Sequence, residues 1–268
     1  MNLVPVADGH DPRLAPYRHL SDADLLRQHG LFVAEGRLVV ERLLADAGYQ
    51  VESLLVNPAS LIALGPALEA RALEASVFLC SNDVFTGMTG FNLHRGCLAL
   101  VRRPPLVNWR EAVAGTRLAV VMEGVTNADN VGGVFRNAAA FGAGAVLLSP
   151  TCCDPLYRKA IRTSMGTVLR VPFARLAPWP GAFAALRSEG FTIAALTPRE
   201  PSITLETFAA SHAACRVALL VGTEGPGLTN AAEESADLRV RIPTAAAVDS
   251  LNLAVATGIA LSHLARFR

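Results

Sequence analysis

The chain has 268 residues, of which 51% are hydrophobic and 18% charged, and its formal net charge is +1 at pH 7. This is an ordinary globular composition, and a net charge so near zero argues against a protein that coats nucleic acid through its overall charge. The apolar runs end well before the roughly 20 residues that a membrane helix needs. Since residues 1–13 lack the pattern of a signal peptide, we expect a cytoplasmic protein of one or two domains.

The cysteines are scattered along the chain and show no metal-binding or redox spacing. They stand at positions 80, 97, 152, 153 and 215. The adjacent pair Cys152 and Cys153 does not form a C-x-x-C motif, and no His pair stands nearby. We therefore expect core thiols, with neither a disulfide nor a metal site.

The first hundred residues predict a small α/β domain over residues 1–104. Ser21 is placed to cap one helix, and a second amphipathic helix is expected near 36–47. The residues predicted to share its buried face are Leu38, Val39, Leu43 and Leu44. Strands are predicted at 51–57, 77–81 and 95–103, with a helix at 66–76 between the first two.

A linker is predicted at Pro104 and Pro105, because proline cannot join a central strand and stiffens a connection. Beyond it, over residues 105–268, near-continuous apolar strands alternate with helices. Strands are expected at 117–123, 144–150, 168–173, 191–198, 216–225 and 238–243, with helices around Arg136, at 154–166, at 182–190 and from about Ser250. This alternation predicts a parallel sheet with helices on both faces.

Sites in parallel α/β sheets form at the carboxyl ends of strands, and three such ends carry unusual polar residues. The first is "NADNVGGVFR" at 127–136, where Asn130 is placed to cap a helix on which Arg136 follows. Taken alone, these are an N-cap and a surface side chain. Five basic residues and one acid lie between 136 and 170. On charge alone, a solvated helix face is favoured there over a phosphate-binding patch.

The second strand end is "LLVGTEGPGL" at 219–228, where a buried strand leads into three glycines and Glu224. Glycines allow a backbone to approach a flat ligand closely. The structural alternative is a tight turn into a helix, with Glu224 near its positive end.

The third is the segment 242–261, where an apolar helix opens with Ser250-Leu251-Asn252. Asp249 or Ser250 would be an ordinary helix cap. Asn252 is harder to explain as a structural residue, because amide side chains are poor helix formers and its neighbours are apolar.

In this order and spacing, the three segments resemble the SPOUT superfamily of knotted methyltransferases, in its TrmH/SpoU branch of RNA ribose 2′-O-methyltransferases. The resemblance rests on N-x-G-x-x-x-R with a following A-x-x-x-G (130–142), G-T-E-G-x-G-L (222–228) and I-P…S-L-N-x-x-V-A (242–256). "RKAIRTSMG" (158–166) is similar to the family's basic R-x-S-x-G segment, and "LFVAEG…VVERLL" resembles its small RNA-recruiting domain. The chain departs from the family at Asn127-Ala128, where many relatives have Asp-Pro, and at "TAAAVD" (244–249).

The resemblance implies a C-terminal parallel-sheet SPOUT domain with a deep trefoil knot, preceded by a small L30e-like α/β substrate-binding domain. It implies S-adenosylmethionine as methyl donor and a homodimer whose second subunit helps to bind RNA. Because this cofactor carries no phosphate, the phosphate fingerprint G-x-G-x-x-G is not required. The residues implied to bind the cofactor are Leu196, Thr197, Gly222, Thr223, Gly225, Ile242, Pro243 and Leu251.

The implied catalytic residues are Arg136, Asn130, Ser250, Asn252 and Glu224. The family assigns removal of the 2′-hydroxyl proton to the residue at Arg136. A guanidinium is a poor base in water, so this role requires desolvation and positioning by Ser250 and Asn252. A second role stays open, in which Arg136 binds the adjacent phosphate and stabilises the developing alkoxide. The residues implied to contact RNA, ribosomal in preference to transfer RNA, are Arg158, Lys159 and Arg162.

Two alternatives remain. A nucleotide-dependent α/β enzyme, such as a nicotinamide oxidoreductase, is disfavoured by the absent G-x-G-x-x-G fingerprint, and a rise in melting temperature with NAD would support it. An RNA-binding module of the same fold without catalysis is disfavoured by the presence of Arg136, Ser250 and Asn252.

Overall fold

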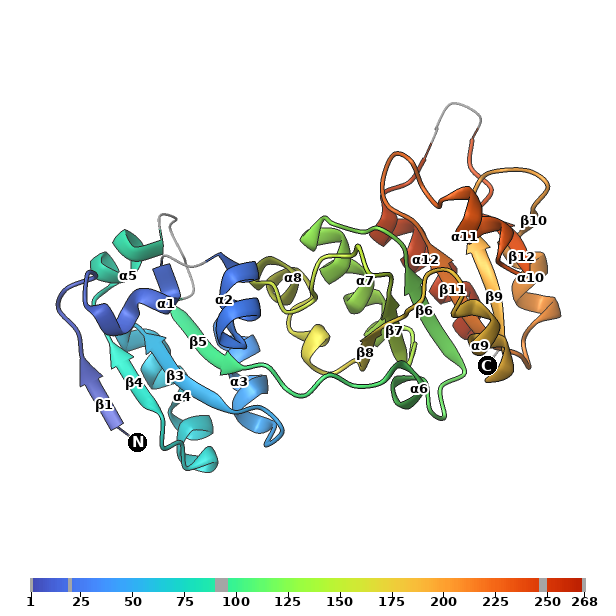
Figure 1. Cartoon of the computed structure of the whole chain (residues 1–268). Coiled ribbons are helices and arrows are strands. Elements are labelled where there is room, and N and C mark those ends of the chain that lie inside the picture. The colour runs from blue at the N-terminus through green and yellow to red at the C-terminus, as the bar shows by residue number, and fades with distance from the viewer. Residues whose placement is uncertain (1, 19–20, 90–95, 246–249, 267–268) are drawn as a thin grey trace. The chain divides into compact units, whose positions relative to one another are not determined.

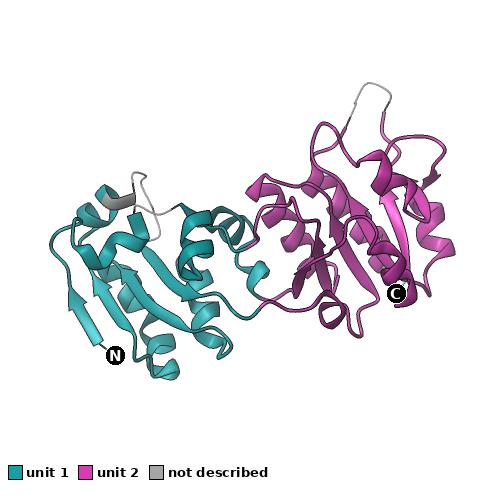
Figure 2. Cartoon of the chain, in the orientation of Figure 1, with its two compact units in different colours: residues 1–105, 156–169 teal, residues 106–155, 170–268 magenta. Residues whose placement is uncertain are grey.

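The computed structural model describes residues 2–18, 21–89, 96–245 and 250–266 (Figure 1). The chain forms two compact units (Figure 2): unit 1 consists of residues 1–105 and 156–169, and unit 2 of residues 106–155 and 170–268. The division after Pro105 adjoins the Pro104–Pro105 segment that the sequence indicated as a linker. Residues 156–169, which the sequence placed in the second domain, pack with unit 1 instead.

Unit 1 is built on a five-stranded mixed sheet in the order β1-β4-β3-β5-β2, in which β5 runs antiparallel to both of its neighbours. Its strands are β1 (Asn2–Pro5), β2 (Leu31–Glu35), β3 (Val51–Val56), β4 (Ser76–Leu79) and β5 (Cys97–Arg102). Its helices are α1 (Ala15–Arg18), α2 (Asp22–His29), α3 (Arg37–Ala45), α4 (Pro58–Arg71), α5 (Asn82–Thr89) and α8 (Arg158–Thr163), with short 3-10 turns at Pro12–Leu14 and Thr167–Leu169. The sequence did not predict β1 and β2.

The helices of unit 1 confirm some of the predicted ends and correct others. Ser21 caps α2, since its Oγ accepts from the amide N–H of Asp24 at 3.1 Å. On α3 the buried face includes Val40 and excludes Leu38, which is 40% exposed. The predicted start of α4 at residue 66 was wrong, because Asn57 caps the helix and its first residue is Pro58.

Unit 2 contains a seven-stranded sheet in the order β10-β12-β9-β11-β6-β7-β8, and every pairing among the described residues is parallel, as predicted. Its strands are β6 (Leu118–Met122), β7 (Ala145–Leu148), β8 (Phe173–Arg175), β9 (Phe191–Leu196), β10 (Ile203–Thr204), β11 (Arg216–Val221) and β12 (Leu238–Arg241). Its helices are α6 (Trp109–Ala112), α7 (Ala128–Ala140), α9 (Phe183–Ser188), α10 (Leu205–Ser211), α11 (Asn230–Glu234) and α12 (Leu253–Arg266). The predicted strand at 168–173 begins only at Phe173.

Both faces of this sheet are covered, which explains the continuous apolar strands. On one face, Ala119 and Val121 of β6 join a core cluster with Trp109 of α6 and Phe183 of α9. The alternate residues of β6 point to the other face and are equally buried. The carboxyl ends of β6, β9, β11 and β12 consequently lie along one edge of the sheet.

The cysteines lie mostly in the interior. Cys80, Cys97 and Cys152 are buried, and Cys153 and Cys215 are partly buried. Burial raises the pKa of Cys97 to about 12, so this thiol stays protonated at neutral pH. Within the described ranges, no three His, Cys, Asp or Glu side chains form a group that could hold a metal ion.

Two sequence expectations extend beyond these descriptions. The trefoil knot stays a prediction from the family resemblance. Residues 246–249, including Asp249, lie outside the part of the chain that the structure describes.

Among the described residues, no helix is both long enough and apolar enough to span a membrane.

Candidate active site

The helix α7 begins three residues earlier than the sequence suggested, and this changes the role of Asn130. The cap is Asn127, whose Oδ1 accepts from the amide N–H of Asp129 at 2.9 Å. The prediction that Asn130 caps the helix was therefore wrong. Asn130 lies in the first turn, is buried, and uses its Oδ1 to accept a hydrogen bond from Nδ2 of Asn252 at 3.1 Å.

Asn252 connects three segments that are far apart in the sequence. Its Oδ1 caps α12 by accepting from the amide N–H groups of Ala254 at 3.0 Å and Val255 at 3.2 Å. Its Nδ2 donates to Oδ1 of Asn130 and, at 2.6 Å, to Oε1 of Glu224. A side-chain amide offers two donors and one oxygen with two lone pairs, and all four positions are used here. We conclude that Asn252 holds the site together and has no free position for a ligand in this conformation.

The helices α7 and α12 lie in close contact next to this network. Nδ2 of Asn137 donates to the carbonyl oxygen of Ala254 at 2.6 Å. A Cβ on Gly133 would lie 2.5 Å from the Cβ of Ala254, a distance that real Cβ atoms do not tolerate. Glycine at this position is therefore what allows the two helices to approach, and Arg136 lies on α7 between these two contacts.

Arg136 itself is exposed on α7. Among the described residues its guanidinium has no hydrogen-bond or ion-pair partner, and it does not line the neighbouring cavity. The structure thus brings Asn130, Asn252 and Glu224 together but shows no contact of Arg136 with Ser250.

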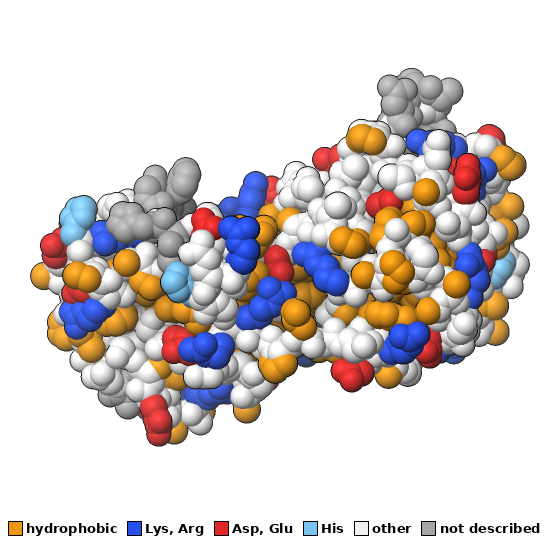
Figure 3. All heavy atoms as spheres, viewed as in Figure 1, with side chains coloured by type: hydrophobic (Ala, Val, Ile, Leu, Met, Phe, Trp, Pro, Cys, Tyr) orange, Lys and Arg blue, Asp and Glu red, His pale blue; other side chains and the backbone are white. Residues whose placement is uncertain are grey.

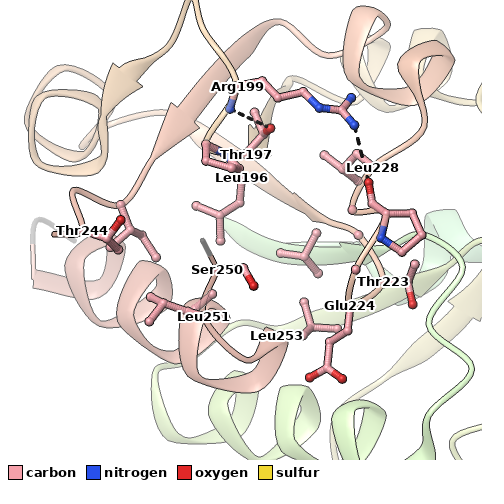
Figure 4. Close-up of a pocket in the computed structure, with 18 residues that line it drawn as sticks. Leu196, Thr197, Arg199, Thr223, Glu224, Leu228, Thr244, Ser250, Leu251 and Leu253 are labelled. Atoms are coloured by element: carbon pink, nitrogen blue, oxygen red, sulfur yellow. Dashed lines mark hydrogen bonds between the residues drawn. The ribbon is translucent and has the colours of Figure 1, made fainter. Parts of the chain in front are cut away.

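A cavity of about 280 Å³ opens where β9, β11 and β12 end (Figure 4). Of the eight residues predicted to bind a cofactor, seven line it: Leu196, Thr197, Gly222, Thr223, Gly225, Ile242 and Leu251. Pro243 does not. Two of the predicted catalytic residues, Ser250 and Glu224, also belong to its walls. In Figure 4 Ser250 lies at the open centre, whereas the carboxylate of Glu224 is directed away from Leu196 and Thr197.

The cavity also has walls that the sequence analysis did not predict. Leu253 and Ala256, three residues apart on one face of α12, supply apolar surface, and their helical spacing was a usable signal. Arg199 offered no such signal. Its amide N–H donates to Oγ1 of Thr197 at 3.2 Å, and its Nη1 donates to Oε2 of the buried Glu233 at 3.0 Å.

The glycine-rich turn at 222–228 forms one wall of the cavity and is folded back on itself. The amide N–H of Gly227 donates to the carbonyl oxygen of Thr223 at 3.1 Å. Gly225 and Gly227 have φ values of 81° and 74°, in the left-handed region that favours glycine. A Cβ on Gly222 would lie 2.4 Å from the carbonyl carbon of Gly227, so the two arms meet backbone to backbone.

The three residues predicted to contact RNA, Arg158, Lys159 and Arg162, lie on α8 in unit 1. Lys and Arg side chains gather over α2 and α8 on the face shown in Figure 3. Part of this segment is used within unit 1. The amide N–H of Arg158 donates to Oδ2 of Asp22 at 2.8 Å, and Nη1 of Arg162 lies 3.6 Å from Oε1 of the buried Glu35.

Comparison with known sequences gives a family and close relatives. The model of the SpoU rRNA Methylase family matches residues 117–262. The chain is 41% identical to an uncharacterized tRNA/rRNA methyltransferase of Mycobacterium bovis, covering 99% of this chain and 93% of the relative. It is 28% identical to the 23S rRNA (guanosine(2553)-2′-O)-methyltransferase of Bacillus subtilis, covering 87% of this chain and 88% of that protein.

Solved structures resemble the chain over nearly its whole length. An AdoMet-bound rRNA methyltransferase from Sinorhizobium meliloti is similar with a TM-score of 0.84 at 26% identity, and 98% of each chain is covered. An RNA 2′-O ribose methyltransferase is similar with a TM-score of 0.80 at 27% identity, again over 98% of each chain.

Proposed function

Because the chain belongs to the SpoU rRNA methylase family, we propose that it transfers a methyl group from S-adenosylmethionine to a ribose 2′-hydroxyl of structured RNA. The observation that carries this proposal is the cavity at the sheet edge, directly bordered by the network of Asn130, Asn252 and Glu224. Three chain segments converge there, and walls from separate segments can hold a donor and an acceptor in a fixed relative position, which is the main need of methyl transfer.

The residues of the cavity fit this cofactor. Leucine and isoleucine side chains offer the apolar contact that an adenine ring needs, and the glycine turn exposes backbone groups for its polar edge. The residues proposed to hold the cofactor are Leu196, Thr197, Gly222, Thr223, Gly225, Ile242 and Leu251. When bound, S-adenosylmethionine supplies an electrophilic methyl group on a positively charged sulfur. The carboxylate of Glu224 adds negative charge to the wall of the cavity.

The acceptor hydroxyl is a weak nucleophile, and its attack is assisted by loss of its proton. Arg136 is the residue proposed to act on it, either by accepting this proton or by binding the adjacent phosphate and stabilising the developing alkoxide. The guanidinium of Arg136 is exposed and has no partner among the described residues, so it is free to bind an RNA phosphate. Asn252 and Asn130 act by fixing the start of α12, and this holds the preceding residues Ser250 and Leu251 in place.

Unit 1 is proposed to recruit the RNA through the basic α8 segment, with ribosomal RNA as the first candidate and transfer RNA as the second. A homodimer in the cytoplasm is part of the same proposal. The names of the relatives support the choice of RNA as substrate, since they include both tRNA/rRNA methyltransferases and a ribosomal 2′-O-methyltransferase.

The test is transfer of a labelled methyl group to RNA from cells that lack the protein, with purified ribosomal and transfer RNA assayed separately. We expect label in the ribosomal fraction. Label in transfer RNA alone would reverse the order of substrates. RNA binding without transfer to either fraction would support the non-catalytic alternative.

A further inference from the structure

The first residue after β6 is a buried carboxylate that the proposed chemistry does not use. Glu123 is 5% exposed and accepts three hydrogen bonds. Its Oε1 accepts from Nε1 of Trp179 at 2.7 Å and from Oγ1 of Thr229 at 2.8 Å, and its Oε2 accepts from the amide N–H of Thr229 at 2.8 Å. A buried carboxylate is costly unless donors surround it in this way. Three donors on one side chain indicate a specific structural task.

That task concerns the glycine-rich turn at 222–228. Thr229 directly follows the turn, and its Oγ1 caps α11 by accepting from the amide N–H of Ala232 at 3.2 Å. Glu123 therefore binds both the backbone and the side chain of the residue at which the turn passes into α11. The neighbouring residue Leu228 lines the cavity.

The donor that is not part of Thr229, Nε1 of Trp179, belongs to a side chain that packs against the core. The ring of Trp179 packs edge-on against Phe183 with ring centroids 4.9 Å apart. Phe183 is fully buried in the cluster that includes residues of β6 and β11. A chain of contacts thus runs from this core through Trp179 and Glu123 to Thr229, where the turn ends.

We propose that Glu123 is a positioning residue that holds the 222–228 turn in its cofactor-binding shape. Glu123 does not line the cavity, and it acts through Thr229. Because the turn is held in place before the cofactor binds, less of the binding free energy is lost in ordering this wall of the cavity. The inference rests on the proposed function, because it takes S-adenosylmethionine as the occupant of the cavity.

The test compares Thr229→Val, which removes the hydroxyl donor, with Thr229→Ser, which keeps it. Titration calorimetry with S-adenosylmethionine measures the Kd, and thermal unfolding without ligand measures stability. We expect Thr229→Val to weaken binding about tenfold, corresponding to about 1.4 kcal/mol, and Thr229→Ser to stay within about twofold of wild type. Glu123→Gln, which replaces one acceptor oxygen by a donor, should weaken binding at least as much.

The loss of a helix cap is controlled by Thr204→Val, because Thr204 caps α10 in the same way and does not line the cavity. We expect it to lower the melting temperature without changing the Kd. Equal Kd values for Thr229→Val and wild type, or an equal loss of affinity in Thr204→Val, would overturn the inference. Absence of binding by the wild-type protein would instead contradict the proposed function.

Discussion

Oδ1 of Asn130 accepts a hydrogen bond of 3.1 Å from Nδ2 of Asn252, a residue 122 positions further along the chain. Asn130 lies in the first turn of α7 and Asn252 immediately precedes α12, so this bond joins the starts of two helices that follow different strands. The same Nδ2 also binds Glu224, which ties the glycine-rich turn to both helices. The site is therefore an arrangement of three segments fixed by one amide.

The first prediction separates the capping role of Asn252 from its bridging role. Asn252→Ser keeps a side-chain oxygen for the cap, but its shorter side chain has a single O–H and cannot donate to both Asn130 and Glu224, whereas Asn252→Ala loses both functions. We expect the alanine variant to be about 1 kcal/mol less stable than the serine variant, the usual value of an N-cap, and both to lose methyl transfer. Urea unfolding and labelled-methyl assays measure the two effects. A serine variant with wild-type activity would show that the bridge is dispensable.

The second prediction concerns Arg136. Its exposed side chain has no partner among the described residues, so Arg136→Ala should change the free energy of unfolding by less than about 0.5 kcal/mol. We expect methyl transfer to be abolished while the Kd for S-adenosylmethionine stays within about twofold of wild type. Arg136→Lys is the control that keeps the charge but loses the planar donor set. Wild-type turnover by the alanine variant would remove Arg136 from the mechanism.

Much of unit 2 was predictable because its signals are local and repeated. Continuous apolar strands of the type seen in β6 and β11 predict a doubly covered parallel sheet, and the structure has one. Seven of the eight predicted cofactor residues line one cavity because the ends of parallel strands meet at a single edge. Their role as cofactor ligands stays a prediction.

The errors arose where tertiary contacts outweigh local preference. Asn130 has the chemistry of an N-cap, but Asn127 takes that position, and the buried amide of Asn130 binds a partner that no local pattern reveals. Residues 156–169 follow a strand of unit 2 yet pack with unit 1, where they contact side chains such as Glu35 and Asp22. These partners lie more than a hundred residues earlier in the chain, so the sequence around 156–169 gives no sign of them. Sequence spacing contains no information about such pairings.

The third prediction tests the close approach of α7 and α12. Gly133→Ala places a Cβ 2.5 Å from that of Ala254, so the helices must separate, and we expect a loss of about 1–3 kcal/mol together with reduced methyl transfer. Gly65→Ala is a matched control inside α4, where an added Cβ meets nothing within 4 Å. It should stabilise by about 0.5–1 kcal/mol. Urea unfolding of both variants checks the signs, and a neutral Gly133→Ala would contradict the packing.

The fourth prediction concerns the ion pair within unit 1. Arg162→Ala leaves the carboxylate of Glu35 buried without that cation, which should cost about 1–3 kcal/mol. The double variant Arg162→Ala with Glu35→Gln should recover part of this loss, because the unpaired charge is gone. Double-mutant analysis of unfolding free energies measures the coupling. Strict additivity would show that the pair contributes nothing. A separate RNA-binding measurement on the double variant tests Arg162 as a phosphate contact, and weaker RNA binding would support that role.

The central claim is transfer of a methyl group to a ribose oxygen, and the most direct measurement is mass spectrometry of nucleosides from RNA treated with the protein and isotopically labelled S-adenosylmethionine. After complete digestion, we predict the label in a nucleoside methylated on its ribose, and no label when Arg136→Ala replaces the wild-type protein. Label on a base, or equal ribose labelling by the variant, would contradict the account.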